Sequence, residues 1–526
     1  MQTTGNTLFW HKATALVQLE KSDRTIVKID DKQIAFFNTD DGIFAINNRC
    51  PHEGYPLIEG SLQGDCKLAC NWHGWAFDLK SGKAIQGRDA VKTYPVKIHD
   101  GYVMVQIVPP DKSVLRTAAL VEFDEAFAEH DYERMARAIC RYEIAEGSLD
   151  AIAIHTVKVS LTTHERGFGH AHAGLADWIS LAGDDNELRL VAFLEALGHF
   201  SWDTIFNPRT AFPERSLAWD QADFLSAIDA MDQPLALSLC RGAFEIGLGF
   251  ADIRPLLLEQ NFRHYAGFGH PAIYLAKAEQ LLEYLGNEIE ETVCLLLTRY
   301  WCIAAREDLI PEFKQFGDLL AVSKNTEDIL LPQPEILCEM PQRKLLPLVD
   351  SAAEEDMEKW ESLLAASAIC MLRFDTARQD IVDQPIAQNV GWLAFTHAIT
   401  FAESLYFHAE RDPSLWRSGL LQQACFIGRN SRFLTQGPTI INATLPDATD
   451  FFAVQKAALF NMDAGDYIYS VHRLKMVSAV EKLVKLVSHD TSKLLISALN
   501  KYLSSPLRQK HPARTILQAK ATVSRE

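Results

Sequence analysis

The chain has 526 residues, of which 48% are hydrophobic and 23% are charged. This is the composition of a globular protein, and at about 100–200 residues per domain the length predicts two to four domains. The formal net charge is −18 at pH 7, which argues against nucleic acid and anionic membranes as partners, because both bind through basic patches. No apolar run reaches the roughly 18 residues of a membrane span, and the first residues lack a signal-peptide pattern. With ten scattered cysteines, which favour reduced thiols, we expect a cytoplasmic protein.

The first part of the chain, residues 1–110, has the pattern of a small all-β domain. Its short segments are rich in β-branched and aromatic residues, as in Ala35–Asn38, Ile43–Ile46 and Tyr102–Val105. Turns of the Asp-Gly type separate these segments. Such alternation of short apolar runs and turns predicts antiparallel strands.

Two boxes in this region combine cysteine with histidine. The first box is Cys50–Gly54, with the sequence Cys-Pro-His-Glu-Gly, and the second is Cys70–Trp75, with the sequence Cys-Asn-Trp-His-Gly-Trp. Two loops of this kind offer two thiolates to one iron and two imidazoles to the other iron of a [2Fe–2S] cluster. Structural zinc sites use different spacings. We therefore predict a [2Fe–2S] cluster bound by Cys50, His52, Cys70 and His73.

Both boxes, and the continuation Gly74–Asp78, resemble the Rieske family. Tyr55 follows Gly54 where respiratory Rieske proteins have a disulfide-forming cysteine, so the segment is most similar to the oxygenase and ferredoxin branch. The resemblance implies a centre that passes single electrons, with a potential in the lower part of the Rieske range.

The remainder, residues 111–526, has a helical pattern. Apolar residues recur at spacings of three and four in Ala272–Leu285, Glu288–Glu307, Met357–Arg373 and Tyr469–Val487. The predicted fold class is α+β multidomain: a small all-β Rieske domain followed by a large all-α multihelical domain with repeated helical units.

The helical part contains a repeated motif. Gly167–His170 recurs as Gly267–His270, and the upstream His164 recurs as His264. A weaker third copy is centred on His397. These matches predict a helical array with a histidine near the start of each unit.

Four segments of this part carry a further similarity: Gly169–Gly183, Gly269–Tyr274, Phe395–Thr400 and His472-x-x-Lys475. Together they resemble the questin oxidase family of ring-cleaving oxygenases. The resemblance implies a mononuclear non-haem iron bound by four histidines, with a lysine carboxylated by CO₂ as a further ligand. The ligands it indicates are His170, His270, His397, His472 and Lys475, with Lys277 as the reserve lysine. The predicted catalytic residues are Lys475, His164 and His264. We expect His164 and His264, together with His172, to be hydrogen-bond partners that fix the tautomers of the ligating imidazoles.

From these resemblances we expect a Rieske-type non-haem iron oxygenase. Electrons from the [2Fe–2S] cluster would drive O₂-dependent hydroxylation or oxidative ring cleavage of an aromatic substrate, polycyclic or polyketide-derived compounds included. The sequence has no Gly-x-Gly-x-x-Gly fingerprint after a strand. We therefore expect an external NAD(P)H-dependent reductase or a ferredoxin as the electron donor.

Three alternatives remain open at this stage. The helical part could be a binding scaffold in an electron-transfer or redox-sensing Rieske protein. The helical part could instead hold two irons or haem; a di-iron oxygenase would use Glu-x-x-His pairs, to which Glu195 and His199 come nearest with one residue too many. A ring-hydroxylating oxygenase would use two histidines and a carboxylate, and the spacing of Asp150, His155 and His164 fits that site poorly.

Overall fold

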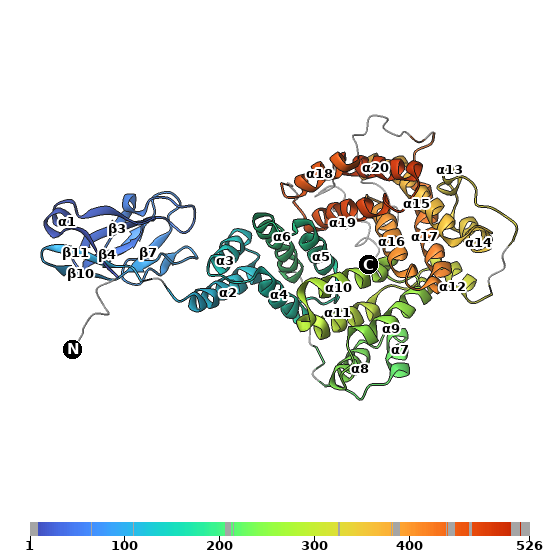
Figure 1. Ribbon diagram of the computed structural model, residues 1–526, viewed down its shortest axis with the longest axis horizontal. Helices are drawn as coiled ribbons and strands as arrows, with labels where there is room; N and C mark the ends of the chain where they lie inside the picture. The colour runs from blue at the N-terminus through green and yellow to red at the C-terminus, as the bar shows by residue number, and fades with distance from the viewer. Residues whose placement is uncertain are drawn as a thin grey trace. The chain divides into compact units, whose positions relative to one another are not determined.

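The computed structural model divides into two compact units, residues 1–111 and 112–526 (Figure 1). It describes residues 9–506 except 65, 109, 206–211, 214, 324–326, 380, 382–389, 438, 440–447 and 462–464, together with residue 516. Within those residues, no helix combines the length and the apolar character that crossing a membrane requires.

The described residues of the N-terminal unit form three antiparallel sheets, one short α-helix, α1 (Leu16–Ser22), and one 3-10 turn, Leu57–Glu59. The sheet orders are β1-β11-β10, β2-β3-β4-β9 and β5-β6-β7-β8. The strands are β1 (Trp10–Ala15), β2 (Arg24–Ile29), β3 (Lys32–Thr39), β4 (Gly42–Asn47), β5 (Ser61–Gln63), β6 (Lys67–Ala69), β7 (Ala76–Asp78), β8 (Ala84–Gln86), β9 (Thr93–Tyr94), β10 (Val96–His99) and β11 (Tyr102–Gln106).

This unit has two separate cores. One core, which includes Ile34, Phe36 and Val103, packs the first two sheets together. The other core includes Phe77 of the third sheet and also buries the two predicted cysteine ligands. The predicted strands fall in β3, β4 and β11, so the small all-β domain is confirmed.

The second unit is multihelical, as predicted. Its described residues contain one isolated β-bridge, Phe374 to Leu434, and no strand. The helices are α2 (Lys112–Glu129), α3 (Tyr132–Ile144), α4 (Leu149–Thr163), α5 (His170–Ala182), α6 (Asn186–Ile205), α7 (Gln221–Asp229), α8 (Gln233–Glu245), α9 (Phe250–Arg263), α10 (His270–Leu285), α11 (Glu290–Ile303), α12 (Lys314–Leu320), α13 (Pro334–Leu337), α14 (Gln342–Ser351), α15 (Asp356–Arg373), α16 (Leu393–Ala409), α17 (Trp416–Asn430), α18 (Ala448–Leu459), α19 (Tyr467–Leu483) and α20 (His489–Ser504).

Four of these helices form a closed ring of neighbours. Helix α5 packs against α10, α10 against α16, α16 against α19, and α19 against α5 (Figure 1). Gly174 allows α5 and α19 to approach closely, because a Cβ at this position would lie 2.6 Å from the Val471 side chain of α19. The ring is therefore tightly packed, and it brings together segments from four distant parts of the sequence.

The sequence repeat corresponds to a structural repeat. His164 caps the C-terminus of α4, and His264 caps the C-terminus of α9 in the same way. In each case a Gly-Phe-Gly segment follows, and the next histidine is the first residue of a ring helix: His170 of α5 and His270 of α10.

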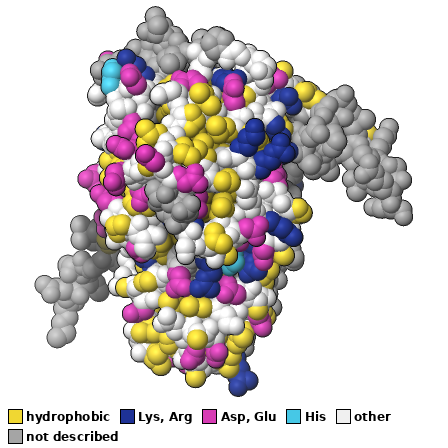
Figure 2. Space-filling model, turned by 90° about the vertical axis from the view of Figure 1, so that its right-hand side faces the viewer, with side chains coloured by type: hydrophobic (Ala, Val, Ile, Leu, Met, Phe, Trp, Pro, Cys, Tyr) yellow, Lys and Arg dark blue, Asp and Glu magenta, His cyan; other side chains and the backbone are white. Residues whose placement is uncertain are grey.

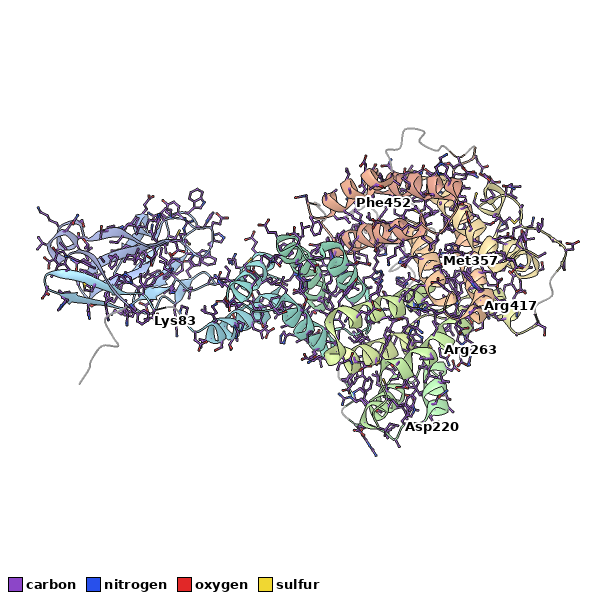
Figure 3. All side chains as sticks on the ribbon, in the orientation of Figure 1. Lys83, Asp220, Arg263, Met357, Arg417 and Phe452 are labelled. Atoms are coloured by element: carbon purple, nitrogen blue, oxygen red, sulfur yellow. The ribbon has the colours of Figure 1, made fainter. Side chains whose placement is uncertain are left out.

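The surface of the helical unit is mixed in charge. The face shown in Figure 2 has acidic and basic side chains interspersed with hydrophobic ones. Ion pairs also lie between helices, as where Arg417 of α17, labelled in Figure 3, binds Asp350 of α14 at 2.8 Å. That pair leaves Arg417 satisfied within the fold, so we assign it no part in ligand binding.

Candidate metal centres

The two cysteine–histidine loops of the N-terminal unit have the same backbone geometry. In the first loop Gly54 donates to the Cys50 carbonyl, and in the second Gly74 donates to the Cys70 carbonyl, at 2.8 and 3.0 Å. Both glycines have φ near +75°, which side-chain-bearing residues rarely adopt. The two loops are thus matched hairpins that present their side chains to a common centre.

The side chains in these loops fit a [2Fe–2S] cluster. Cys50 and Cys70 are 3% and 2% exposed, and the rings of His52 and His73 lie 4.7 Å apart. Nδ1 of His52 is buried without a hydrogen-bond partner among the described residues. Burial, with the Cys70 sulfur adding to it, raises the pKa of the Cys50 thiol to about 11. Such a thiol becomes a thiolate only beside a strong cation, and an iron centre supplies one.

Comparison with known proteins agrees with this geometry. The model of the Rieske [2Fe-2S] domain family matches residues 9–97. The ferredoxin component of the naphthalene 1,2-dioxygenase system of Pseudomonas putida is 32% identical over 103 residues, which are 19% of this chain and 98% of the ferredoxin. The 3-phenylpropionate/cinnamic acid dioxygenase ferredoxin subunit of Shigella flexneri serotype 5b (strain 8401) is 37% identical over 76 residues, 14% of this chain and 72% of the subunit.

Among solved structures, the terminal oxygenase of carbazole 1,9a-dioxygenase from Nocardioides aromaticivorans IC177 matches with 25% identity and a TM-score of 0.18. The match covers 19% of this chain and 31% of the oxygenase.

The N-terminal unit is thus an iron–sulfur electron-transfer domain. Through residues 9–97 the chain belongs to the Rieske [2Fe–2S] family. The helical unit has to be understood from its own side chains.

The helical ring brings together the four predicted imidazoles, which we call the four-histidine cluster: His170, His270, His397 and His472. His170 and His270 begin α5 and α10, whereas His397 and His472 lie within two turns of the starts of α16 and α19. Neighbouring ring centroids are 4.4 to 5.0 Å apart. Possible ligand atoms of His170, His397 and His472 all lie within 4.8 Å of one another, an arrangement that could hold a metal ion.

Hydrogen bonds fix which ring nitrogens face the centre. Nδ1 of His270, His397 and His472 each lies 2.6 Å from a backbone carbonyl, that of Gly267, Leu393 and Ile468 respectively. A carbonyl only accepts, so these three Nδ1 atoms must carry the hydrogen. Their Nε2 atoms are therefore bare acceptors that point at one another.

Two short contacts follow from that arrangement. Nε2 of His397 lies 3.1 Å from Nε2 of His472, and Nε2 of His270 lies 3.3 Å from Nε2 of His170. Because the carbonyls hold the hydrogens of His397 and His472 on Nδ1, neither Nε2 can donate to the other. Two facing lone pairs in a buried site are unfavourable unless a cation lies between them.

A proton is a poor candidate for that cation. Burial, together with the nearby Lys475 ammonium, holds the pKa of His170, His397 and His472 well below the usual range. Burial also lowers the pKa of His270 to about 4, against the opposing effect of the Gly267 carbonyl. The cluster is thus a set of neutral imidazoles, the form that binds transition metals.

The fourth imidazole has a different partner. The Tyr274 hydroxyl lies 3.2 Å from Nδ1 of His170. Tyr274 is one turn after His270 on α10, so the helix that provides one histidine also orients the histidine of its neighbour. Nothing in the sequence alone relates Tyr274 to His170, which is 104 residues away.

Lys475 lies beside the cluster and is almost fully buried. Its Nζ is 5.7 Å from the centre of the Tyr274 ring. Burial lowers the pKa of Lys475 to about 7, with the Lys277 ammonium also lowering it and the Asp177 carboxylate opposing. A large fraction of Lys475 is therefore a neutral amine near neutral pH.

The reserve lysine, Lys277, is in a different state. Its Nζ donates to Oδ1 of Asp177 at 2.6 Å, and both side chains are buried. Burial alone would lower the pKa of Lys277, but Asp177 and Glu403 outweigh it and raise the pKa. This lysine is held as a cation in an ion pair, so Lys475 is the better candidate for carboxylation.

Two cavities adjoin the cluster. The first has a volume of about 410 Å³ and is lined by His164, His170, His270 and Tyr274, among others. The second, of about 330 Å³, is lined by His270 and His397. The Phe268 side chain lines both.

The other predicted histidines lie around the first cavity or away from it. His164 lines this cavity, and its buried Nε2 has no partner among the described residues. His172 is held by the Gly169 amide and the Ser160 hydroxyl, at 3.1 and 2.9 Å. His264 instead binds Glu307 at 2.9 Å and lines neither cavity.

The residues of the alternative sites have separate partners. Asp150 binds Arg189 at 2.7 Å, and His155 binds Asp124 at 2.7 Å. Glu195 accepts from the Ser470 hydroxyl at 2.9 Å. Within the described chain, the one group of possible metal ligands that includes a carboxylate is that of His52, Glu53 and His73, and it contains neither Asp150 nor Glu195.

Proposed function

We propose that the helical unit binds one non-haem iron through the four-histidine cluster, and that the chain is an iron-dependent oxygenase of an aromatic substrate. The facing Nε2 atoms of His397 and His472 are the observation on which this proposal depends. Neutral imidazoles whose hydrogens are fixed on Nδ1 form a ready-made donor set for a divalent transition metal.

Lys475 completes this proposed centre after reaction with CO₂. The neutral amine attacks CO₂, a C–N bond forms, and one proton leaves for solvent, which gives a carbamate with one negative charge. An ammonium at this position would repel a metal cation, whereas a carbamate oxygen would bind it. The lowered pKa of Lys475, about 7, favours the amine form that this step requires.

The aromatic residues that line the first cavity bind the substrate. Phe168, Phe268 and Tyr300 line the first cavity and give it aromatic faces beside His170. Such faces suit a planar aromatic ring. Tyr274 holds His170 in place, and an iron bound here would supply the one-electron chemistry that O₂ requires for reaction with an aromatic ring.

The Rieske domain fits this proposal as the source of electrons. The similar ferredoxins are named as components of dioxygenase systems. We propose that an external reductase or ferredoxin reduces the [2Fe–2S] cluster of this chain, and that the cluster then supplies these electrons to the iron site of the helical unit.

Iron analysis tests the proposal. The purified chain should contain three irons, two in the Rieske cluster and one in the helical unit. Replacing His397 with Ala should remove the single iron and leave the Rieske absorption and EPR signal intact. The matched control, His264→Ala, changes a histidine that binds Glu307 and should retain all three irons.

Other counts would support the alternatives. Four irons would indicate a di-iron centre, and two irons with an unchanged His397→Ala variant would leave an electron-transfer protein with a helical scaffold. O₂ consumption coupled to loss of an aromatic substrate, measured with a reductase present, then separates an oxygenase from an iron-binding scaffold.

A further inference from the structure

The second cavity is lined by a cation with which no described residue forms an ion pair. Arg429, in the last turn of α17, lines this cavity, and its guanidinium carbon lies 5.2 Å from the centre of the Phe268 ring. It is half-buried and forms no ion pair with any described residue. The residues that line this cavity in the described part of the chain include no aspartate or glutamate.

Neighbouring cations differ from Arg429 in this respect. Arg432 pairs with Glu312 at 3.3 Å, and Arg378 pairs with Asp375 at 3.7 Å. Lys501, next to Trp392, donates to three backbone carbonyls, the closest at 2.7 Å. Each of these cations thus has a partner within the fold, whereas Arg429 has no ion-pair partner among the described residues.

A second hydrogen-bond donor lies on the same cavity. Trp392 is 1% exposed, and its Nε1–H has no partner among the described residues. A buried indole N–H normally finds an acceptor, because leaving it unpaired costs free energy. Arg429 and Trp392 together therefore offer donors, and the lining residues add the aromatic rings of Phe268 and Phe433.

We propose that Arg429 and Trp392 bind the carboxylate of an aromatic acid, which is the substrate class of the helical unit. The guanidinium fork matches the two carboxylate oxygens, and the indole N–H adds a third hydrogen bond. Phe268 and His270 line both this cavity and the first one, so an acid whose carboxylate is held here extends past Phe268, with its ring beside the four-histidine cluster and toward the aromatic faces of the first cavity. This inference rests on the proposed oxygenase function and makes Arg429 a specificity-determining residue.

Binding of matched probes tests the assignment without turnover. The full chain, with its iron counted, is titrated anaerobically and without reductant by calorimetry with 1-naphthoate and with the neutral 1-naphthamide. Wild type should bind the acid about 10- to 100-fold more tightly than the amide, as a charge-assisted hydrogen bond predicts. Arg429→Gln should bring this ratio close to one.

Two arginine variants are the controls. Arg432→Gln changes an ion-paired neighbour, and Arg166→Gln changes an arginine that lines the first cavity. Both should keep the wild-type ratio. Any of three results would overturn the proposal. Wild type could bind acid and amide equally, Arg429→Gln could keep the wild-type acid-to-amide ratio, or Arg166→Gln could lose that ratio instead.

Two further measurements keep the test decisive. If Arg429→Gln loses its helical circular dichroism or its iron, Trp392→Phe decides, since it removes one N–H and keeps an aromatic ring. That variant should lower the acid-to-amide ratio about threefold or more, and an unchanged ratio would contradict the assignment. Tighter binding of 1-naphthol than of 1-naphthoate would overturn the assignment of a carboxylate and indicate a phenol as the group that is bound. Because binding and iron content are measured separately, failure here leaves the iron centre untouched, and missing iron refutes the proposed function instead.

Discussion

At the scale of single residues, the four imidazoles are of two kinds. Those of His270, His397 and His472 are oriented by backbone carbonyls, which no substitution removes. That of His170 depends on a side chain, the Tyr274 hydroxyl. The geometry of the cluster is therefore most sensitive to mutation at His170, through Tyr274, a residue outside the cluster.

Tyr274→Phe should weaken iron binding in the helical unit. Loss of a hydrogen bond that orients a ligating imidazole typically costs about 10- to 100-fold in metal affinity. Competition with a chelator, followed by iron analysis, measures this change, and the Rieske spectrum should stay the same. Tyr300→Phe, which removes a hydroxyl from the same cavity, is the control. Equal iron retention in both variants would show that the hydrogen bond to His170 is dispensable.

A second residue-scale prediction concerns pH and His408 of α16. Arg254 donates to its Nδ1, and its Nε2–H donates to the Ala272 carbonyl of α10 at 3.0 Å. Burial lowers its pKa to about 4 from 6.5. Between these values the unfolded chain binds a proton that the folded chain does not, so stability falls as the pH falls through this window.

His408→Gln should remove that part of the acid sensitivity, because an amide can replace both hydrogen bonds without titrating. From pH 7 to pH 5, wild type should lose roughly 2 kcal/mol more free energy of unfolding than the variant. Urea unfolding at the two pH values measures this. The control His489→Gln alters an exposed histidine and should behave like wild type. Parallel losses in wild type and His408→Gln would contradict the assignment.

Sequence reasoning identified the residues whose contexts recur and missed those that only tertiary contact defines. The contexts of His170 and His270 repeat, so both could be selected from the sequence. Tyr274, Trp392 and Arg429 have no such motif, since their importance arises from helices that meet far apart in the chain. Lys475 could be preferred to Lys277 from the family resemblance, and the ion pair of Lys277 with Asp177 adds a physical reason that the sequence does not contain.

At the scale of elements, the segment Gly267–Gly269 positions α10. All three residues have positive φ, Phe268 included, at 51°, 54° and 80°. A Cβ on Gly269 would lie 2.8 Å from Phe426 and 2.9 Å from Phe401. The backbone thus turns sharply between packed rings, and this turn sets the position of His270, the next residue.

Gly269→Ala should both destabilise the unit and release its iron. The positive φ alone costs about 1 kcal/mol for a residue with a Cβ, and the contacts with the two phenylalanines add to it. Gly286→Ala, at the other end of α10, is the matched control, because it has φ of +78° with nothing within 4 Å of its Cβ. Thermal unfolding and iron content are compared for both. Iron loss in Gly286→Ala as large as in Gly269→Ala would show that helix strain alone is responsible.

Helix positions were more predictable than helix ends. The periodicity of Ala272–Leu285 and Met357–Arg373 corresponds closely to α10 and α15. The pattern at Glu288–Glu307 continues beyond α11, which ends at Ile303 because Ala304 is extended, with ψ of 127°. The amide of Gly267 donates to the carbonyl of Ala305. This tertiary contact fixes an extended segment where the periodicity had predicted more helix.

At the scale of the whole molecule, the two units have separate hydrophobic cores, two in the N-terminal unit and one in the helical unit. Loss of one metal centre should therefore leave the other intact. Cys70→Ser should lower the iron content from three to one per chain and abolish the Rieske EPR signal. Reductase-dependent turnover should stop as well, whereas Cys240→Ser, at a buried cysteine of the helical unit, should retain all three irons. Continued turnover by Cys70→Ser would mean that electrons reach the helical unit by another route.

The spacing of the four histidines along the chain has a consequence for folding. His170 and His270 are 100 residues apart, and His397 and His472 are 75 apart. An ion held by all four would act as a cross-link that closes several long loops at once, and it would reduce the chain entropy of the unfolded state for as long as it stayed bound. If the proposed ion is present, its removal by a chelator should also lower the stability of the helical unit, since it would remove a link between four helices that are far apart in the sequence.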